Sequence, residues 1–265
     1  MKKLSFQIIG SSSSGNCAVL RSPDCTVLVD AGLSGKKIAN GLAALGMTLR
    51  DVDAVFFTHD HTDHCAGMRG IGGEEHLEFF ANRLTAGAID RRFDRRFRWQ
   101  FFETGTSFDY CGLRVSAFPV PHDTNDPVGF VFSCGETPGT TEKIAWVTDC
   151  GKITNVVRRA VADADALVLE ANYDEGMLSA AARPAGVKAR IRGTHGHLSN
   201  DAAAEFLRDY ENDRLEHLLL AHVSRECNAR GIVEQACFGA LGSRASRAAV
   251  VDPSAMLPEN AGWGF

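Results

Sequence analysis

A run of seven residues constrains this chain more than any other feature of its sequence. It reads Thr58-His59-Asp60-His61-Thr62-Asp63-His64 and directly follows the apolar segment Ala54–Phe57. Three imidazoles and two carboxylates so close together cannot pack into an apolar core, because each needs a hydrogen-bond partner or an opposite charge. Neutral imidazole and carboxylate are also groups that bind zinc, manganese and iron. We interpret the run as a metal-binding loop at the end of a strand, with a tight turn at Gly67 behind it.

Three further candidate ligands share one position, the end of a predicted strand. His122 follows the segment 113–120, Asp149 ends 144–148 and His222 ends 218–221. Functional groups of helix-covered sheets gather at the carboxyl ends of strands, so we expect these side chains to meet the histidine run. The predicted first ion is held by His59, His61 and His122, the second by Asp63, His64 and His222, and Asp149 bridges the two. The alternative is a solvated polar loop with structural histidines.

Short apolar segments of strand length recur along the chain, with amphipathic segments between several of them. The predicted strands are Ser5–Ile9, Thr26–Val29, Ala54–Phe57, Leu113–Phe118, Val128–Phe132, Ile144–Val147, Ala166–Leu169, Leu218–Leu220 and Ala249–Val251. The predicted helices are Lys36–Leu45, Ile153–Ala162, Ala202–Tyr210 and Ile232–Leu241. We find no repeat, linker or charge block in the sequence and treat residues 1–265 as one domain. This mixture indicates an α/β fold whose sheets are covered by helices.

The composition of the chain limits the binding partners that the protein can have and the cellular compartment in which it is expected. The formal net charge of −5 argues against strong overall attraction to nucleic acid or anionic lipid, while a local basic patch stays compatible. No apolar stretch of the sequence approaches the roughly 20 residues that span a membrane, and the first residues show no secretory apolar region. The 8 cysteines are scattered, so we expect reduced thiols in the cytoplasm, with Cys65 and Cys150 packed under the site.

Five further segments make the sequence similar to the YycJ-like branch of the metallo-β-lactamase superfamily. They are SSSSGNC (11–17), DAGLS (30–34), LEANYD (169–174), GHLSN (196–200) and AHVSRECN (221–228). The resemblance spans nearly the whole chain and implies a four-layer αββα sandwich with a two-metal site between the sheets. Members of this branch are regarded as DNA exonucleases, and the wider nuclease group includes ribonucleases Z and J. Arg183–Ile191 replaces an aromatic, proline-containing stretch of the family pattern, and Tyr173 stands where a histidine is common.

Two positions separate reaction classes within the superfamily that the sequence resembles. Position 149 is aspartate, where the best-known class of zinc β-lactamases has a cysteine. Position 61 is histidine, where the redox-active di-iron branch has a glutamate. A bridging carboxylate and nitrogen-rich ligands suit hydrolysis by a metal-bridging hydroxide. The resemblance therefore favours hydrolysis over redox chemistry and makes β-lactam cleavage a weaker expectation.

Glu170 and His197 are the candidate proton-transfer pair. Glu170 ends the predicted strand 166–169, and His197 lies beside a glycine in the GHLSN segment. Two ions would clamp the attacking and phosphoryl oxygens, whereas the leaving oxygen still needs a proton, which a carboxylate–imidazole pair supplies. Alternatively, Glu170 is a buried hydrogen-bond anchor and His197 a turn residue. Asn200 is expected to cap a helix beginning near Asp201, whose N-terminus would also suit a phosphate.

Two basic clusters are candidates for contact with nucleic acid. Arg183, Lys188, Arg190 and Arg192 lead directly into the GHLSN segment, so Arg190 and Arg192 are the predicted substrate-binding arginines together with Asn200. The second cluster, Arg91–Trp99, is interpreted as one amphipathic helix with arginines on its flanks. The alternative for this second cluster is a phosphate-tracking ridge with Trp99 stacked on a base.

The predicted function is that of a two-metal phosphodiesterase acting on nucleic acid, and the resemblance implies DNA degraded from a 5′ end. Zinc or manganese are the expected ions, and iron is a further option. Asp63 would ligate one ion and orient the nucleophile, and His197 would protonate the leaving oxygen with support from Glu170. One alternative is hydrolysis of a small thioester, lactone or β-lactam by the same ions, and another is a metal-stabilised binding module. The oligomeric state is left open.

Overall fold

Two β-sheets dominate the structure, a computed structural model that describes residues 4–135 and 140–264. The first sheet contains β1 (Ser5–Gly10), β2 (Cys17–Arg21), β3 (Thr26–Val29), β4 (Ala54–Phe56), β5 (Glu78–Ala81), β6 (Trp99–Phe101) and β14 (Gly262–Trp263). The second contains β7 (Ser107–Tyr110), β8 (Leu113–Pro119), β9 (Val128–Cys134), β10 (Glu142–Val147), β11 (Ala166–Glu170), β12 (His217–Ala221) and β13 (Ala248–Val250). Their orders are β14-β1-β2-β3-β4-β5-β6 and β13-β12-β11-β10-β9-β8-β7.

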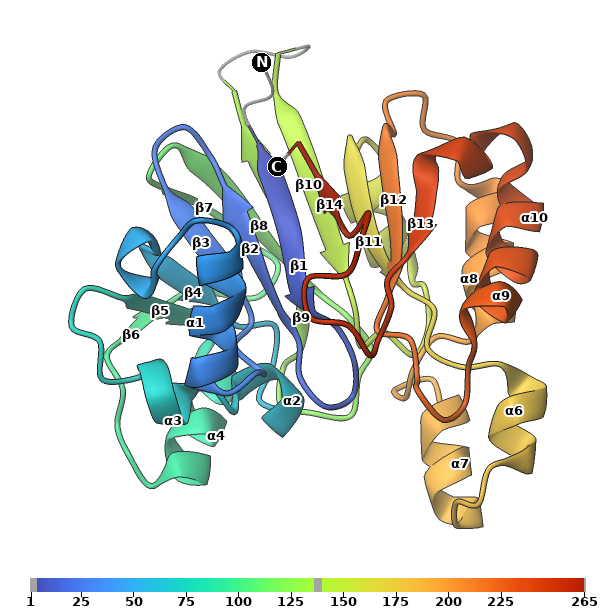
Figure 1. Cartoon of the computed structure of the whole chain (residues 1–265), viewed down its shortest axis with the longest axis horizontal. Coiled ribbons are helices and arrows are strands. Elements are labelled where there is room, and N and C mark those ends of the chain that lie inside the picture. Colours follow the sequence, from blue (N-terminus) through green and yellow to red (C-terminus); the bar gives the residue numbers. More distant parts are fainter. Residues whose placement is uncertain (1–3, 136–139, 265) are drawn as a thin grey trace.

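Helices cover the outer face of each sheet (Figure 1). On the side of the first sheet lie α1 (Gly35–Ala44), α2 (Thr62–Cys65), α3 (Met68–Ile71) and α4 (Arg83–Phe93). On the side of the second lie α8 (Asn200–Asp209), α9 (Arg230–Val233) and α10 (Gly239–Leu241), with α6 (Glu175–Ala180) and α7 (Ala185–Arg192) beyond its lower end. α5 (Asn155–Val161) packs Val157 and Val161 into the apolar cluster of the second sheet. This order of layers confirms the predicted αββα sandwich. Among helices of the described residues, none has both the length and the apolar character to cross a bilayer.

Alternation along the strands explains the layers, as β4 and the residue after it illustrate. Ala54 and Phe56 belong to the apolar cluster between the sheets, whereas Val55 and Phe57 belong to the cluster beneath α1 and α4. Successive side chains of a strand point to opposite faces, so a strand covered on both faces reads as a continuous apolar run. A third cluster, on the outer face of the second sheet, includes Phe206 of α8.

Parallel pairing sets the position of the functional loops. β3, β4 and β5 run parallel to one another in the first sheet, as do β10, β11 and β12 in the second. The carboxyl ends of parallel neighbours open at the same rim of a sheet. The loops that follow β4, β10 and β12, where the candidate ligands were expected, therefore start at those rims.

The basic segment 91–99 is not one helix, contrary to our interpretation. α4 ends at Phe93, because Asp94 takes a left-handed backbone conformation (φ 45°) and caps the helix. The chain then continues to β6, which begins at Trp99. The ring of Trp99 packs among phenylalanines on the outer face of the first sheet, and its nitrogen donates to Asp90 Oδ1 (2.9 Å). This indole therefore serves packing and is not placed to stack on a base.

Candidate metal centre

The candidate ligands converge where loops from both sheets meet. His59 follows β4, His122 follows β8, Asp149 follows β10 and His222 follows β12. Within each of two groups, one potential ligand atom per residue lies within 4.8 Å of the others: His59 with His61 and His122, and Asp63 with His64 and His222. The structure thus brings together the same two sets of side chains that the sequence pattern proposes for two ions.

Asp149 lies between these two sets. Its Oδ2 is 3.1 Å from His64 Nε2, and its Oδ1 is 3.5 Å from Nε2 of both His122 and His222. The carboxylate is 2% exposed. The carboxylate thus approaches His122 of the first set through Oδ1 and both His64 and His222 of the second set, which is the position that a bridging ligand requires.

The backbone turns sharply at three strand ends of the site. Asp30, directly after β3, has φ 59°, Asp149 has φ 54° and His222 has φ 55°. This left-handed conformation costs an L-residue roughly 1–2 kcal/mol, although aspartate and histidine adopt it more readily than most residues. Strain of this kind concentrates at functional sites, and here it occurs at two candidate ligands and at the partner of a third.

A buried hydrogen-bond chain orients His59 and His64. His64 Nδ1 donates to Asp30 Oδ2 (2.8 Å), and the Thr58 hydroxyl donates to the same oxygen (2.8 Å). The Thr58 oxygen in turn accepts from His59 Nδ1 (3.0 Å). Because a carboxylate only accepts, both imidazoles carry a proton on Nδ1, so Nε2 is the nitrogen that each can offer to a metal ion. Partners of this kind fix the tautomer and ring orientation of metal-binding histidines.

His122 and His222 are oriented in the same way. His122 Nδ1 donates to the carbonyl of Gly196 (2.9 Å), and His222 Nδ1 donates to Glu170 Oε1 (3.1 Å). His61 differs, because it presents Nδ1 toward His122 Nε2 at 3.2 Å. All of these imidazoles therefore direct a ring nitrogen to the centre of the cluster.

Unpaired buried atoms show that this donor set fits metal ions. His59 Nε2 and His222 Nε2 are buried and have no hydrogen-bond partner within the described part of the chain. A buried polar atom without a partner is costly, and lone pairs of neutral imidazoles beside carboxylates suit divalent cations. The cluster could therefore hold divalent metal ions.

Charges within the cluster are mutually compensating. Burial lowers the pKa of His59 well below its usual value, and the charge of His64 adds to this effect. Burial opposes protonation of His64 and His222 as well, but the surrounding carboxylates, Asp149 first among them, together outweigh it. The pKa of His64 therefore lies well above its usual value, and that of His222 is about 10. Protons on these two imidazoles balance the charge of Asp149, and a divalent cation would take their place.

Gly67 lies in a turn behind the metal-binding loop, as predicted, and it also permits a close approach. Ala66 and Gly67 form the turn between α2 and α3, and the φ of Gly67, −63°, is one that any residue adopts. A Cβ at this position would lie 2.5 Å from the Leu33 carbonyl oxygen and 2.6 Å from that of Ala31, and the Gly67 amide donates to Ala31 (2.7 Å). The glycine thus lets the metal-binding loop dock against the segment that carries Asp30.

Cys65 and Cys150 turn away from the ligand cluster. Cys65 Sγ donates to the carbonyl of Asp60 (3.5 Å), and Cys150 Sγ donates to that of Lys152 (3.2 Å). Burial raises the pKa of both thiols to about 12. Both contacts favour the packing role expected from the sequence over thiolate ligation.

Glu170 and His197 form a direct pair beside the cluster. His197 Nδ1 donates to Glu170 Oε1 (2.8 Å), and Glu170 Oε2 accepts from the amide of Cys150 (2.8 Å). Burial alone would raise the pKa of Glu170, but His197 and His222 outweigh it and lower the pKa to about 2. Burial likewise opposes the charge on His197, but Glu170 raises its pKa. Because Nδ1 is engaged, His197 keeps Nε2 available for another partner.

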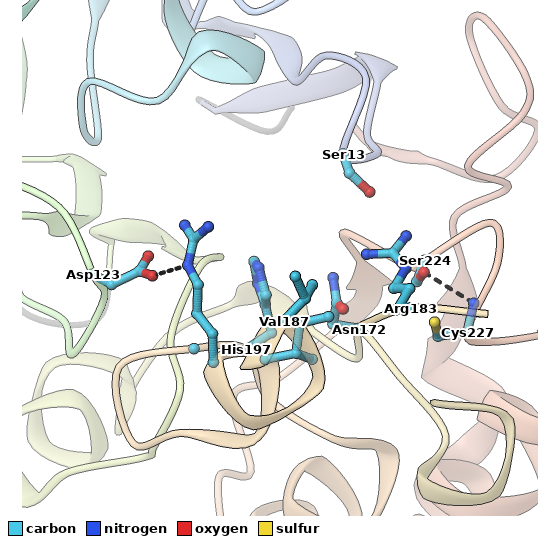
Figure 2. A pocket seen from close by; sticks show the side chains of 11 residues that line it. Ser13, Asp123, Asn172, Arg183, Val187, His197, Ser224 and Cys227 are labelled. Atoms are coloured by element: carbon cyan, nitrogen blue, oxygen red, sulfur yellow. Dashed lines mark hydrogen bonds and ion pairs between the residues drawn. The ribbon is translucent and has the colours of Figure 1, made fainter. Parts of the chain in front are cut away.

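A cavity of about 140 Å³ opens beside His197 (Figure 2). Figure 2 shows Ser13 across the cavity from His197 and Asn172, with Asp123 and Arg183 on opposite sides. Arg190 also lines the cavity, and its Nε donates to Asp123 Oδ2.

Arg192, the second predicted substrate-binding arginine, is not among the residues that line this cavity. Its Nε donates to Glu175 Oε1 (2.8 Å), and its Nη2 donates to Ser179 Oγ (2.6 Å). α7 therefore directs its two arginines to different partners. The geometry supports Arg190 as a contact for substrate and gives Arg192 a structural ion pair instead.

Asn200 has a structural role that differs from the predicted one. Ser199 caps α8 by accepting from the amide of Ala202 (3.1 Å), so the helix begins at Asn200 and the prediction of an Asn200 cap is wrong. The Asn200 amide is 2% exposed and exchanges two hydrogen bonds with Asn228 (2.9 and 2.8 Å). Its polar atoms are used inside the fold, which excludes it as a phosphate contact.

Two residues of the site have no role in the predictions from the sequence. Asp30 orients His64, and Asn172 donates to the His222 carbonyl (2.7 Å). Arg183, a member of the predicted basic cluster, lines the cavity. Asp30 had a usable signal, since it directly follows a predicted strand as the other candidate ligands do. Asn172 and Arg183 lay within segments already singled out, but their neighbours come from distant parts of the chain.

Comparison with known proteins agrees with this geometry. Residues 26–222 match the family described as Beta-lactamase superfamily domain. The chain belongs to the metallo-β-lactamase superfamily. It is 30% identical over 232 residues to "Exodeoxyribonuclease YycJ" of Bacillus anthracis, covering 86% of this chain and 85% of that protein. It is also 30% identical over 230 residues to "Exodeoxyribonuclease WalJ" of Streptococcus pneumoniae, covering 85% and 83%.

A solved structure extends the likeness to the whole architecture of this metallo-β-lactamase-superfamily hydrolase. The metallo-β-lactamase fold protein YhfI from Bacillus subtilis superposes with a TM-score of 0.71 at 15% identity. The match covers 99% of this chain and 100% of the other. At this identity the likeness supports the shared fold.

Proposed function

We propose that this hydrolase, acting as a single domain, is a phosphodiesterase that removes nucleotides from DNA in the 5′ to 3′ direction with two divalent ions, zinc or manganese. The exodeoxyribonuclease names of relatives 30% identical over most of the chain support a nuclease. Zinc suits the histidine-rich ligand set, and the shared carboxylate also suits manganese or iron. No disulfide joins cysteines of the described residues, which supports a reducing, cytoplasmic location.

The proposed metal ligands form the same two groups that lie close together in the structure. His59, His61 and His122 would hold one ion and Asp63, His64 and His222 the other, with Asp149 shared. Bound together, two divalent ions supply an activated water nucleophile and positive charge for the phosphoryl oxygens. Asp63 is the more accessible carboxylate, with 23% of its side chain exposed against 3% for Asp149. That exposure lets Asp63 orient the attacking water.

His197 is the proposed proton donor. Its Nδ1 is held by Glu170, so Nε2 can donate to the departing oxygen of the cleaved phosphodiester. Glu170 acts through His197 as a positioning residue that keeps the imidazole protonated and correctly oriented. The observation that carries the proposal of a nuclease is the position of His197, which lines the arginine-lined cavity, lies 3.7 Å from Asp149 Oδ1 and is held from behind by the buried Glu170.

Parallel degradation assays test the proposed function. Purified protein is supplied with Zn²⁺ or Mn²⁺ and mixed with end-labelled single-stranded DNA, duplex DNA or RNA. DNA shortened from the 5′ end is the expected product, and His61→Ala or Asp149→Asn should slow it at least about a hundredfold, because metals contribute several kcal/mol. His76→Ala is a matched control, since His76 is exposed and belongs to none of the candidate metal-binding groups of the described residues. Its Nε2 donates to the carbonyl of Leu49 (3.0 Å), and its Nδ1 lies 3.9 Å from Glu74 Oε2. Unchanged rates in both ligand variants, or turnover of thioesters and lactones alone, would contradict the proposal.

A further inference from the structure

The cavity beside His197 has the shape and donors of a phosphate subsite. We propose that it binds the 5′-terminal phosphate of the strand being shortened, an inference that rests on the proposed nuclease function. The arginines that line it, Arg183 and Arg190, come from the segment that leads into residues 196–200.

Two arginines supply directed donors to the cavity. Arg183 Nε donates to Glu226 Oε2 (2.8 Å), and Arg190 Nε donates to Asp123 Oδ2. These carboxylates neutralise much of the formal charge but hold each guanidinium by one edge. In the described residues, Arg183 Nη1 and both terminal nitrogens of Arg190 make no hydrogen bond. A guanidinium fixed in this way presents its remaining donors in the fork geometry that matches phosphate.

A buried hydroxyl adds a neutral donor at the floor of the cavity. Ser224 is 6% exposed, and its Oγ accepts from the amide of Cys227 (3.1 Å). This contact uses a lone pair, so the hydroxyl proton stays available for an acceptor in the cavity. Figure 2 places Ser224 beside Arg183, with Ser13 on the facing side. A phosphate between them would meet donors from three separate segments of the chain.

Size favours the end of a strand over a continuous strand. The cavity measures about 140 Å³, and a protein cavity of about 150 Å³ holds one benzene molecule. It accommodates one phosphate-sized group but not a nucleoside. The buried side chains of Asn172, Ser224 and Cys227 line its floor, so a strand cannot continue past them. A terminal phosphate in this cavity places a following linkage on the side of His197 and the metal cluster.

Paired oligonucleotides that differ only at the 5′ end test the subsite by binding. The probe is a 3′-fluorescein DNA strand whose first linkages are methylphosphonates, which resist hydrolysis, with either a 5′-phosphate or a 5′-hydroxyl. Fluorescence anisotropy with the Zn²⁺-loaded protein should give about tenfold tighter binding of the 5′-phosphate form, as expected for charge-assisted hydrogen bonds. Arg183→Gln and Arg190→Gln should each remove most of that preference.

A matched control separates the subsite from general charge. Arg230 makes the same kind of ion pair, Nε to Glu234 Oε1 (2.7 Å), outside the cavity, so Arg230→Gln should keep the preference. Equal binding of both probes while unmodified DNA is still hydrolysed would overturn the subsite and leave the nuclease function standing. A preserved 5′-phosphate preference without hydrolysis of DNA or RNA would support the subsite and refute the nuclease function.

Discussion

Replacing Asp30 with asparagine tests whether the buried hydrogen-bond chain sets the tautomer of the metal-facing histidines. Asp30 is 1% exposed, its Oδ2 accepts from His64 Nδ1 (2.8 Å), and its Oδ1 accepts from the Thr58 amide (2.8 Å). Asparagine has nearly the same shape and tolerates the left-handed backbone at this position, so the fold should persist. Its NH₂ group, however, must replace one of the two accepting oxygens with a donor.

The Thr58 amide is always a donor, whereas the imidazole of His64 can carry its proton on either ring nitrogen. The imidazole is therefore the group that changes. We expect the NH₂ group to face His64, whose proton then shifts from Nδ1 to Nε2 and blocks the nitrogen aimed at the cluster. Losing the partner of a metal-binding histidine typically lowers metal affinity 10–100-fold. This corresponds to about 1.4–2.8 kcal/mol at 1.4 kcal/mol per tenfold.

Competition with a fluorescent chelator measures the Zn²⁺ affinity of the Asp30→Asn variant. Asp165→Asn is the matched control. Asp165 is a buried carboxylate directly before β11, at the end of that strand opposite to Glu170, and it accepts hydrogen bonds from the amide of Lys143 (2.7 Å) and from Arg214 (2.8 Å). The control should lose thermal stability but keep its Zn²⁺ affinity. Wild-type Zn²⁺ affinity in the Asp30→Asn protein would refute the reasoning.

Three other predictions address proton transfer, charge and the thiols. Glu170→Gln should lower kcat about a hundredfold and move the alkaline limb of the pH profile to lower pH, because Glu170 raises the pKa of His197 against the effect of burial; an unchanged profile would contradict this role. The pKa values of His64 and His222 are raised, so Zn²⁺ must displace protons from these imidazoles when it binds. The affinity of the protein for Zn²⁺ should therefore rise with pH from about 6 to 9. Calorimetry in buffers of different ionisation enthalpy measures the proton release, and finding none would contradict this prediction. Iodoacetamide should modify Cys111 alone in the native protein, since the other cysteines are buried; mass spectrometry showing several adducts would count against it.

The layers and the ligand positions were accessible from the sequence because they follow from local patterns. A buried strand reads as an apolar run, and a polar residue at its end marks the functional rim, as Asp149 and His222 illustrate. Edge strands such as β6 and β14 are too short to show a recognisable alternation of apolar and polar residues, so the sequence does not predict them. The end of α4 depends on one residue with a left-handed backbone, Asp94, which the spacing of apolar residues does not predict.

The supporting interactions were not accessible because they join segments far apart in the chain. The pairing of Asn200 with Asn228 and of Arg192 with Glu175 depends on how α6, α7 and α8 pack together. A single polar residue in a motif can bind substrate or form a hydrogen bond within the fold, and the sequence does not distinguish the two roles until its partner is known. The sequence therefore indicated which chemistry the site carries better than it indicated which polar side chains face the substrate.

An anomalous difference map from crystals grown with Zn²⁺ tests the central claim most directly. The account predicts two peaks per chain on either side of the Asp149 carboxylate. One peak should contact His59, His61 and His122, and the other should contact Asp63, His64 and His222. A single peak, or zinc bound only away from Asp149, would contradict the claim that this chain builds a two-ion site.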